Sequence, residues 1–91
     1  MLHKTRLRQW LCTVTGFRGI TIRQAAQELG MPTEVLSRRL SGTISVQRKD
    51  AVLMAKWGAE FGNPSAADIW AWSAEPPLNA GEFFEMFGQP Q

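Results

Sequence analysis

Apolar residues recur at intervals of three and four along almost the whole chain, and this spacing restricts the fold more than any other feature. Leu7, Trp10, Leu11 and Val14 stand at positions i, i+3, i+4 and i+7, which is the pattern of an amphipathic helix. No segment shows the period of two that a half-buried strand requires. With 91 residues, the chain is long enough for one modest core and too short for two. The sequence therefore predicts an all-α fold, a compact bundle of five or six short helices.

Glycines, prolines and capping residues predict where these helices begin and end. The "TGFRG" segment, with two glycines, is expected to end the first helix, and the "AEPP" segment the fifth. The predicted helices cover residues 4–16, 22–29, 33–41, 46–61, 64–73 and 80–87. The expected N-terminal caps are Thr21, Thr33, Ser45 and Asn79, and Gly30 and Gly42 are expected just past helix ends.

The run "TIRQAAQELGMPTEVLSRRLSG", residues 21–42, joins two predicted helices by a very short connection. Ala26 is small enough to let the two helices approach closely, and Gly30 allows the positive φ of a sharp turn. Leu36 and Leu40 lie four apart and are expected to hold the second of these helices on the core. This is the pattern of a helix-turn-helix, which presents its second helix to a DNA major groove.

In these residues the chain resembles the DNA-binding domain of the lambda-repressor-like family, also called the XRE family. The resemblance covers residues 5–73 and rests on the "LG" turn, "LSRRLSG" and "AKWGAEFG". Within the family, the chain is most similar to small repressors of actinobacteria and their phages. It implies a sequence-specific regulator that binds double-stranded DNA, a repressor without catalytic activity or cofactor. The predicted division is a DNA-binding domain over 1–73 and an aromatic-rich extension over 74–91, for packing or dimerisation. Arg39 departs from the family pattern, because an apolar residue is usual there.

The resemblance also implies which side chains contact DNA. Arg38 is expected to bond to guanine and Glu34 to accept a hydrogen bond from cytosine. The residues expected to face base edges are Thr33, Glu34, Ser37 and Arg38, and those expected near phosphates are Arg23, Gln24, Arg39, Thr43 and Arg48. For each of them the alternative is an ordinary solvated surface side chain.

The distribution of charge favours a polyanionic partner. Residues 1–49 contain nine cations and two anions, a formal charge of +7, whereas residues 50–91 contain one cation and six anions, a charge of −5. A basic half and an acidic half predict one face for a polyanion and one face turned away from it. The alternative is that both halves are simply solvated.

Other function classes find little support in the sequence. The single cysteine, Cys12, and the single histidine, His3, provide neither a disulfide framework nor a multi-ligand metal site, and Cys12 is expected to be a small core residue. No paired carboxylate, nucleophile–histidine set or phosphate loop is evident, so an enzyme ranks last. No signal peptide or long apolar run is visible, so a cytoplasmic location without membrane contact is expected.

The aromatic residues near the C-terminus suggest a second type of contact. Trp70 and Trp72 are two apart, so one helix cannot bury both on the same face; Ile69 and Trp70 are expected to be buried and Trp72 exposed. The tail either folds back over Trp72 or binds a second copy or another protein. The residues of this predicted partner interface are Trp72, Phe83, Phe84 and Phe87. The alternative function is therefore a helix-turn-helix module for protein–protein interaction.

Overall fold

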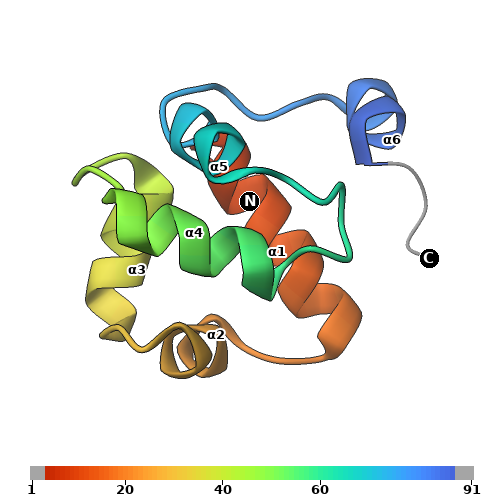
Figure 1. Ribbon diagram of the computed structural model, residues 1–91. Helices are drawn as coiled ribbons and strands as arrows, with labels where there is room; N and C mark the ends of the chain where they lie inside the picture. The colour runs from red at the N-terminus through yellow and green to blue at the C-terminus, as the bar shows by residue number, and fades with distance from the viewer. Residues whose placement is uncertain (1–3, 88–91) are drawn as a thin grey trace.

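The computed structural model describes residues 4–87, which form six helices and no strand. They are α1 (Arg6–Arg18), α2 (Ile22–Leu29), α3 (Thr33–Ser41), α4 (Arg48–Trp57), α5 (Ala66–Trp72) and α6 (Ala80–Phe87). The predicted all-α bundle of short helices is confirmed. Helices α2 to α5 surround α1, and α6 stands apart at one end of the molecule (Figure 1).

The core forms around α1. Leu7, Trp10, Leu11 and Val14 are fully buried, as their spacing predicts. The indole Nε1 of Trp10 donates a hydrogen bond to the carbonyl oxygen of Phe61, over 2.8 Å. The same ring lies so close to the end of α4 that a Cβ on Gly58 would approach its Cζ2 atom to 2.3 Å. Only glycine fits there with Trp10 in this position.

The ends of the first three helices agree with the sequence in part. Thr21 caps α2, and Gly30 and Gly42 follow α2 and α3 in the left-handed conformation, as expected. The "TGFRG" segment ends α1 as predicted, but it does so at Gly19 and not at residue 16, because α1 continues through Gly16 to Arg18. A single helical glycine costs only about 1 kcal/mol, which the buried face of α1 offsets. Thr33 does not cap α3, whose N-cap position is taken by Pro32 without a side-chain hydrogen bond.

Helices α4 and α5 are shorter than the sequence suggests, whereas α6 has the predicted bounds. Helix α4 begins at Arg48 after Gln47, so the cap predicted at Ser45 is wrong. The intervening Val46 is buried in the core while its backbone is not helical, which explains the early apolar residue in the pattern. Helix α5 begins after Ser65, whose side chain accepts a hydrogen bond from the backbone of Asp68. For α6 the expected cap is confirmed, since Asn79 Oδ1 accepts from the backbone N–H of Glu82 over 2.9 Å.

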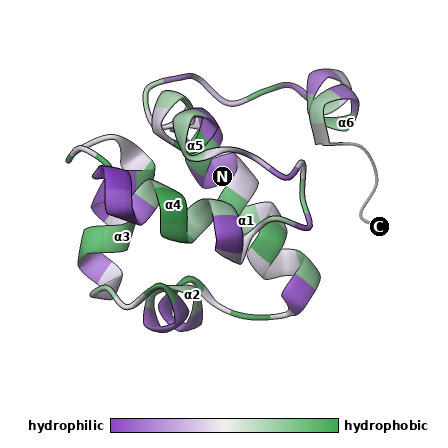
Figure 2. Cartoon of the chain, in the orientation of Figure 1, coloured by the Kyte–Doolittle hydropathy of each residue, from purple (hydrophilic) through white to green (hydrophobic). Residues whose placement is uncertain are grey.

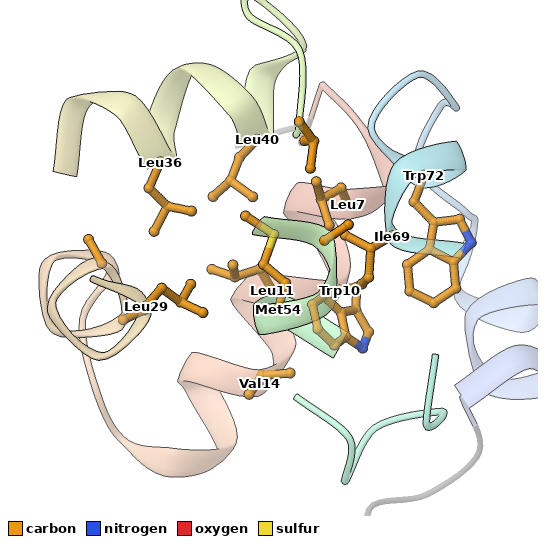
Figure 3. Packing of buried hydrophobic residues seen from close by; sticks show 14 of the residues in the cluster. Leu7, Trp10, Leu11, Val14, Leu29, Leu36, Leu40, Met54, Ile69 and Trp72 are labelled. Carbon is orange, nitrogen blue, oxygen red and sulfur yellow. The ribbon is translucent and has the colours of Figure 1, made fainter. Parts of the chain in front are cut away.

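The two tryptophans of α5 are placed opposite to the prediction. Trp72 is only 7% exposed and lies with its ring centroid 5.9 Å from that of Trp10, whereas Trp70 is 63% exposed. Residues three apart share a helix face and adjacent residues do not, so Trp72 joins Ile69 in the core (Figure 3). Phe83 is partly buried against the core and Phe84 is 60% exposed. The side chain of Phe87, also predicted at a partner interface, lies outside the part of the chain that the structure describes.

Candidate nucleic-acid interface

Helix α2 begins with a reciprocal pair of hydrogen bonds. The hydroxyl oxygen of Thr21 accepts from the backbone N–H of Gln24 over 3.1 Å, and the side-chain oxygen of Gln24 accepts from the backbone N–H of Thr21 over 2.8 Å. Such a capping box satisfies two backbone donors that a helix start leaves open. On the inner side of α2, Ala25 and Ala26 are buried, and their small side chains let the neighbouring helices approach closely.

The turn between α2 and α3 has a geometry that glycine makes possible. Gly30 has φ 72° and ψ 31°, a conformation that side chains other than glycine rarely adopt. The backbone N–H of Met31 then reaches the carbonyl oxygen of Ala26 over 3.0 Å, which closes the end of α2. Pro32 is extended, and α3 starts directly after it. Two helices thus meet through three residues, as the sequence predicts.

Helix α3 has one buried and one exposed side. Leu36 and Leu40 project from α3 into the core, where Figure 3 shows them above Leu29 of α2 and Met54 of α4. Their relative exposures are 0% and 1%. The four residues predicted to face base edges are all exposed: Thr33, Glu34, Ser37 and Arg38. Because each of these positions lies three or four residues from another of them, they form a single outward face.

Arg39, which is predicted from the sequence to lie near phosphates, does not belong to this outward face. Its side chain is only 12% exposed, and its Nη1 atom lies 2.8 Å from Oδ2 of Asp50, which is itself buried. The same Nη1 lies 3.7 Å from the sulfur of Met31. Arg39 replaces the apolar residue expected here because a buried carboxylate on α4 neutralises it. Helix α3 is therefore oriented about its axis as Leu36 and Leu40 predict, although Arg39 stands at a position where an apolar residue is expected.

This ion pair connects two helix ends of opposite polarity. Arg39 lies in the last turn of α3 and Asp50 in the first turn of α4. A cation at a C-terminal end and an anion at an N-terminal end are each favoured by the helix dipole. Among the described residues, the Nε atom of Arg39 is buried without a hydrogen-bond partner. The spacing of Asp50, Ala51 and Met54, all buried on α4, is the signal that would have placed Asp50 on the inner side.

The remaining residues predicted near phosphates surround α3. Arg23, Gln24, Thr43 and Arg48 are exposed, on α2, on the loop after α3 and at the start of α4. In the described part of the chain, no ion pair uses Arg23, Arg38 or Arg48. Figure 2 shows strongly hydrophilic residues on α2 and at the start of α4, beside α3. Unpaired cations thus lie on both sides of the outward face.

Two other cations of the basic half are neutralised by residues further along the chain. Arg6 pairs with Glu75 over 3.0 Å. Arg18 lies 2.7 Å from Glu60 and 3.4 Å from Glu28, and its guanidinium stacks on the Trp57 ring at 4.8 Å from the centroid. No pattern in the sequence indicates this cluster, whose members come from α1, α2, the end of α4 and the turn that follows it. The excess of positive charge in the first half is therefore smaller on the surface than in the sequence.

Further features of the described residues concern metal binding, membrane crossing and the one cysteine. Residues 4–87 contain no group of three or more side chains placed to hold a metal ion, and none of their helices is long and apolar enough to cross a membrane. Cys12 is partly buried rather than fully buried. Its burial raises the pKa of the thiol, with Arg8 opposing this effect, and a raised pKa disfavours the reactive thiolate.

In comparisons with known proteins, no family model, no curated protein and no solved structure matches this chain. The resemblance to lambda-repressor-like regulators therefore stays a prediction. The arrangement of α2, α3 and the start of α4 is the basis for a functional proposal.

Proposed function

We propose that the protein binds double-stranded DNA in a sequence-specific manner through the outward face of α3 and acts as a transcriptional regulator, in the manner of a repressor. One observation carries the proposal. Thr33, Glu34, Ser37 and Arg38 are exposed together on a helix whose opposite side is held in the core by two leucines. A helix presented in this way fits the B-DNA major groove, which is about 12 Å wide.

The chemistry of the four side chains suits base recognition. The Arg38 guanidinium can donate two hydrogen bonds to O6 and N7 of guanine, and the Glu34 carboxylate can accept from N4 of cytosine. The hydroxyls of Thr33 and Ser37 both donate and accept, so they tolerate several bases. Arg23 and Arg48 flank this face and are suited to phosphates, which fix the position of a protein on the duplex.

The salt dependence of DNA binding tests the proposal. The affinity for a random duplex is measured over a range of salt concentrations. Each phosphate contact should contribute about −0.9 to the slope of log K against log salt concentration, so three contacts would give a slope near −3. We expect clear binding at low salt that weakens steeply as salt is added. Binding without a salt slope, or no binding, would contradict the proposal.

The Arg38→Ala variant tests the assignment of base contacts, on a site selected from a random pool of duplexes. We expect it to weaken binding to the selected site by about 1–3 kcal/mol and to relax the preference at one base pair. Lys56→Ala is the control, because it removes an exposed cation near the other end of α4. Equal losses on selected and random duplexes would assign Arg38 to a phosphate instead.

The alternative, a protein-interaction module centred on Trp72, is weaker than the sequence suggested. Trp72 is buried beside Trp10 and is not available to a partner. Its neighbour Trp70 and the helix α6 provide the exposed aromatic surface instead.

A further inference from the structure

Trp70 stands between two hollows on the surface of the bundle. One hollow, of about 420 Å³, lies between the start of α4 and α5 and is lined by Arg48, Ala51, Ala66, Ala67 and Trp70. The other, of about 270 Å³, lies beside the loop after α3 and is lined by residues that include Ile44, Val46, Trp70 and Ala71. Trp70 belongs to both, and at 63% it is more exposed than any other large apolar side chain in residues 4–86. An exposed indole between two largely apolar hollows is typical of a protein contact surface.

Helix α6 exposes part of its apolar surface in the structure of residues 4–87. Phe84 and Met86 are 60% and 46% exposed, while Phe83 is partly buried against the core. In the described part of the chain, the backbone of α6 comes close to no other helix, and Figure 1 shows it set apart. Helix α6 also carries Glu82 and Glu85, and no Lys or Arg follows Lys56 in the sequence. It is therefore an apolar and acidic helix.

We propose that α6 of one copy binds the Trp70 surface of a second copy of this chain. Phe84 and Met86 would contact Trp70 and fill the hollows beside it, and the carboxylates of α6 would lie near Arg48. The two surfaces match in both respects, since each is apolar and their charges are opposite.

A second copy is a better occupant than the same chain, because α6 is already fixed to its own bundle on other residues. The side-chain amide of Gln9 on α1 makes two hydrogen bonds of 2.7 Å with the backbone of Leu78, just before α6. Phe83 is packed against the core. For α6 to reach Trp70 of its own chain, these contacts would have to open. Binding to a second copy leaves them intact.

The size of the contact predicts a weak dimer. A large aromatic side chain buries about 150–250 Å² when it is fully covered. If each copy offers both α6 and its Trp70, the two contacts together bury on the order of 1,000 Å², which is at the lower end of specific interfaces. We therefore expect dissociation constants in the micromolar range or above, and measurements must extend to several hundred micromolar protein.

Sedimentation equilibrium of the full chain without DNA tests this proposal. We expect a concentration-dependent dimer, and we expect Trp70→Ser and Phe84→Ser each to be monomeric. An equimolar mixture of the two variants should associate more than either variant alone but less than wild type, because the intact α6 of one can meet the intact Trp70 of the other at only one of the two contacts. Leu53→Ser is the control, since Leu53 is 46% exposed on α4 and does not line either hollow; it should leave the dimer unchanged. Thermal melting followed by circular dichroism checks that each variant is folded.

Three results would overturn the proposal. A wild-type chain that stays monomeric at several hundred micromolar has no such interface. A Trp70→Ser variant that still dimerises indicates contact between two α6 helices, and a Phe84→Ser variant that still dimerises indicates contact between two Trp70 surfaces. Because no DNA is present, these outcomes are independent of the salt titration that tests DNA binding.

Discussion

Helices α3 and α6 have nearly the same length, nine and eight residues, but they are attached to the bundle in different ways. Helix α3 is the more polar of the two, yet Leu36 and Leu40 are completely or almost completely buried. Helix α6 has four large apolar residues among its eight, yet Phe84 and Met86 are exposed. Apolar content therefore does not decide whether a helix joins the core. The position of the apolar residues relative to the neighbouring helices decides it, and for α3 an ion pair and a short turn contribute as well.

The largest expected effect comes from removing the ion pair of α3, which has no counterpart on α6 among residues 4–87. We expect Asp50→Ala to lower the free energy of unfolding by about 3 kcal/mol or more, because the Arg39 guanidinium is left buried and unpaired. Urea denaturation measures the change. The double variant Arg39→Met with Asp50→Leu is the control, and it should recover most of the loss because no charge is then buried. A loss below about 1 kcal/mol for Asp50→Ala would indicate that Arg39 reaches water, which would weaken the contrast between the two helices.

The sequence predicted those features that depend on neighbouring residues and a helical period. The turn at Gly30, the inward leucines of α3 and its outward polar set all follow from positions within one or two turns of each other. The pairing of Arg39 with Asp50 joins residues on different helices, so the pattern within α3 alone suggested a surface cation. Asp50 could still have been recognised as buried from its spacing to Met54.

The wrong prediction of which tryptophan of α5 is buried has a different cause. From the sequence, the adjacent residues Ile69 and Trp70 are expected to be buried together, although residues three apart share a face more closely than adjacent ones. The start of α4 is predicted too early, because Ser45 is a favourable capping residue and Val46 is apolar. In the structure, Val46 enters the core from a segment that is not helical. Tertiary packing decided both cases, and capping preference is too weak to compete with it.

Replacing leucine by alanine should cost more free energy of unfolding at a buried position of α3 than at an exposed position of α4. Leu36→Ala leaves a cavity under α3, and we expect it to lower the free energy of unfolding by about 2–3 kcal/mol. Leu53→Ala removes the same atoms from a side chain that is 46% exposed on α4, and we expect a loss below about 1 kcal/mol. Urea denaturation of both variants gives the difference. Equal losses would mean that the inward face of α3 does not carry the stability assigned to it.

The smallest expected effect concerns the attachment of α6, which in the described residues involves Phe83, Leu78 and the hydrogen bonds of Gln9. Amide hydrogen exchange at low protein concentration should show α6 opening locally while α3 opens only with the whole bundle, because few buried contacts hold α6. Phe83→Ala removes a half-buried ring, and we expect it to lower the free energy of α6 opening by about 1 kcal/mol. In this variant, the free energy of opening of the α3 amides should still equal the free energy of global unfolding. Phe84→Ala is the control, since this ring is exposed in the isolated chain. If the amides of α3 and α6 instead exchanged with the same free energy of opening, the two helices would belong to one cooperative unit despite their different contacts.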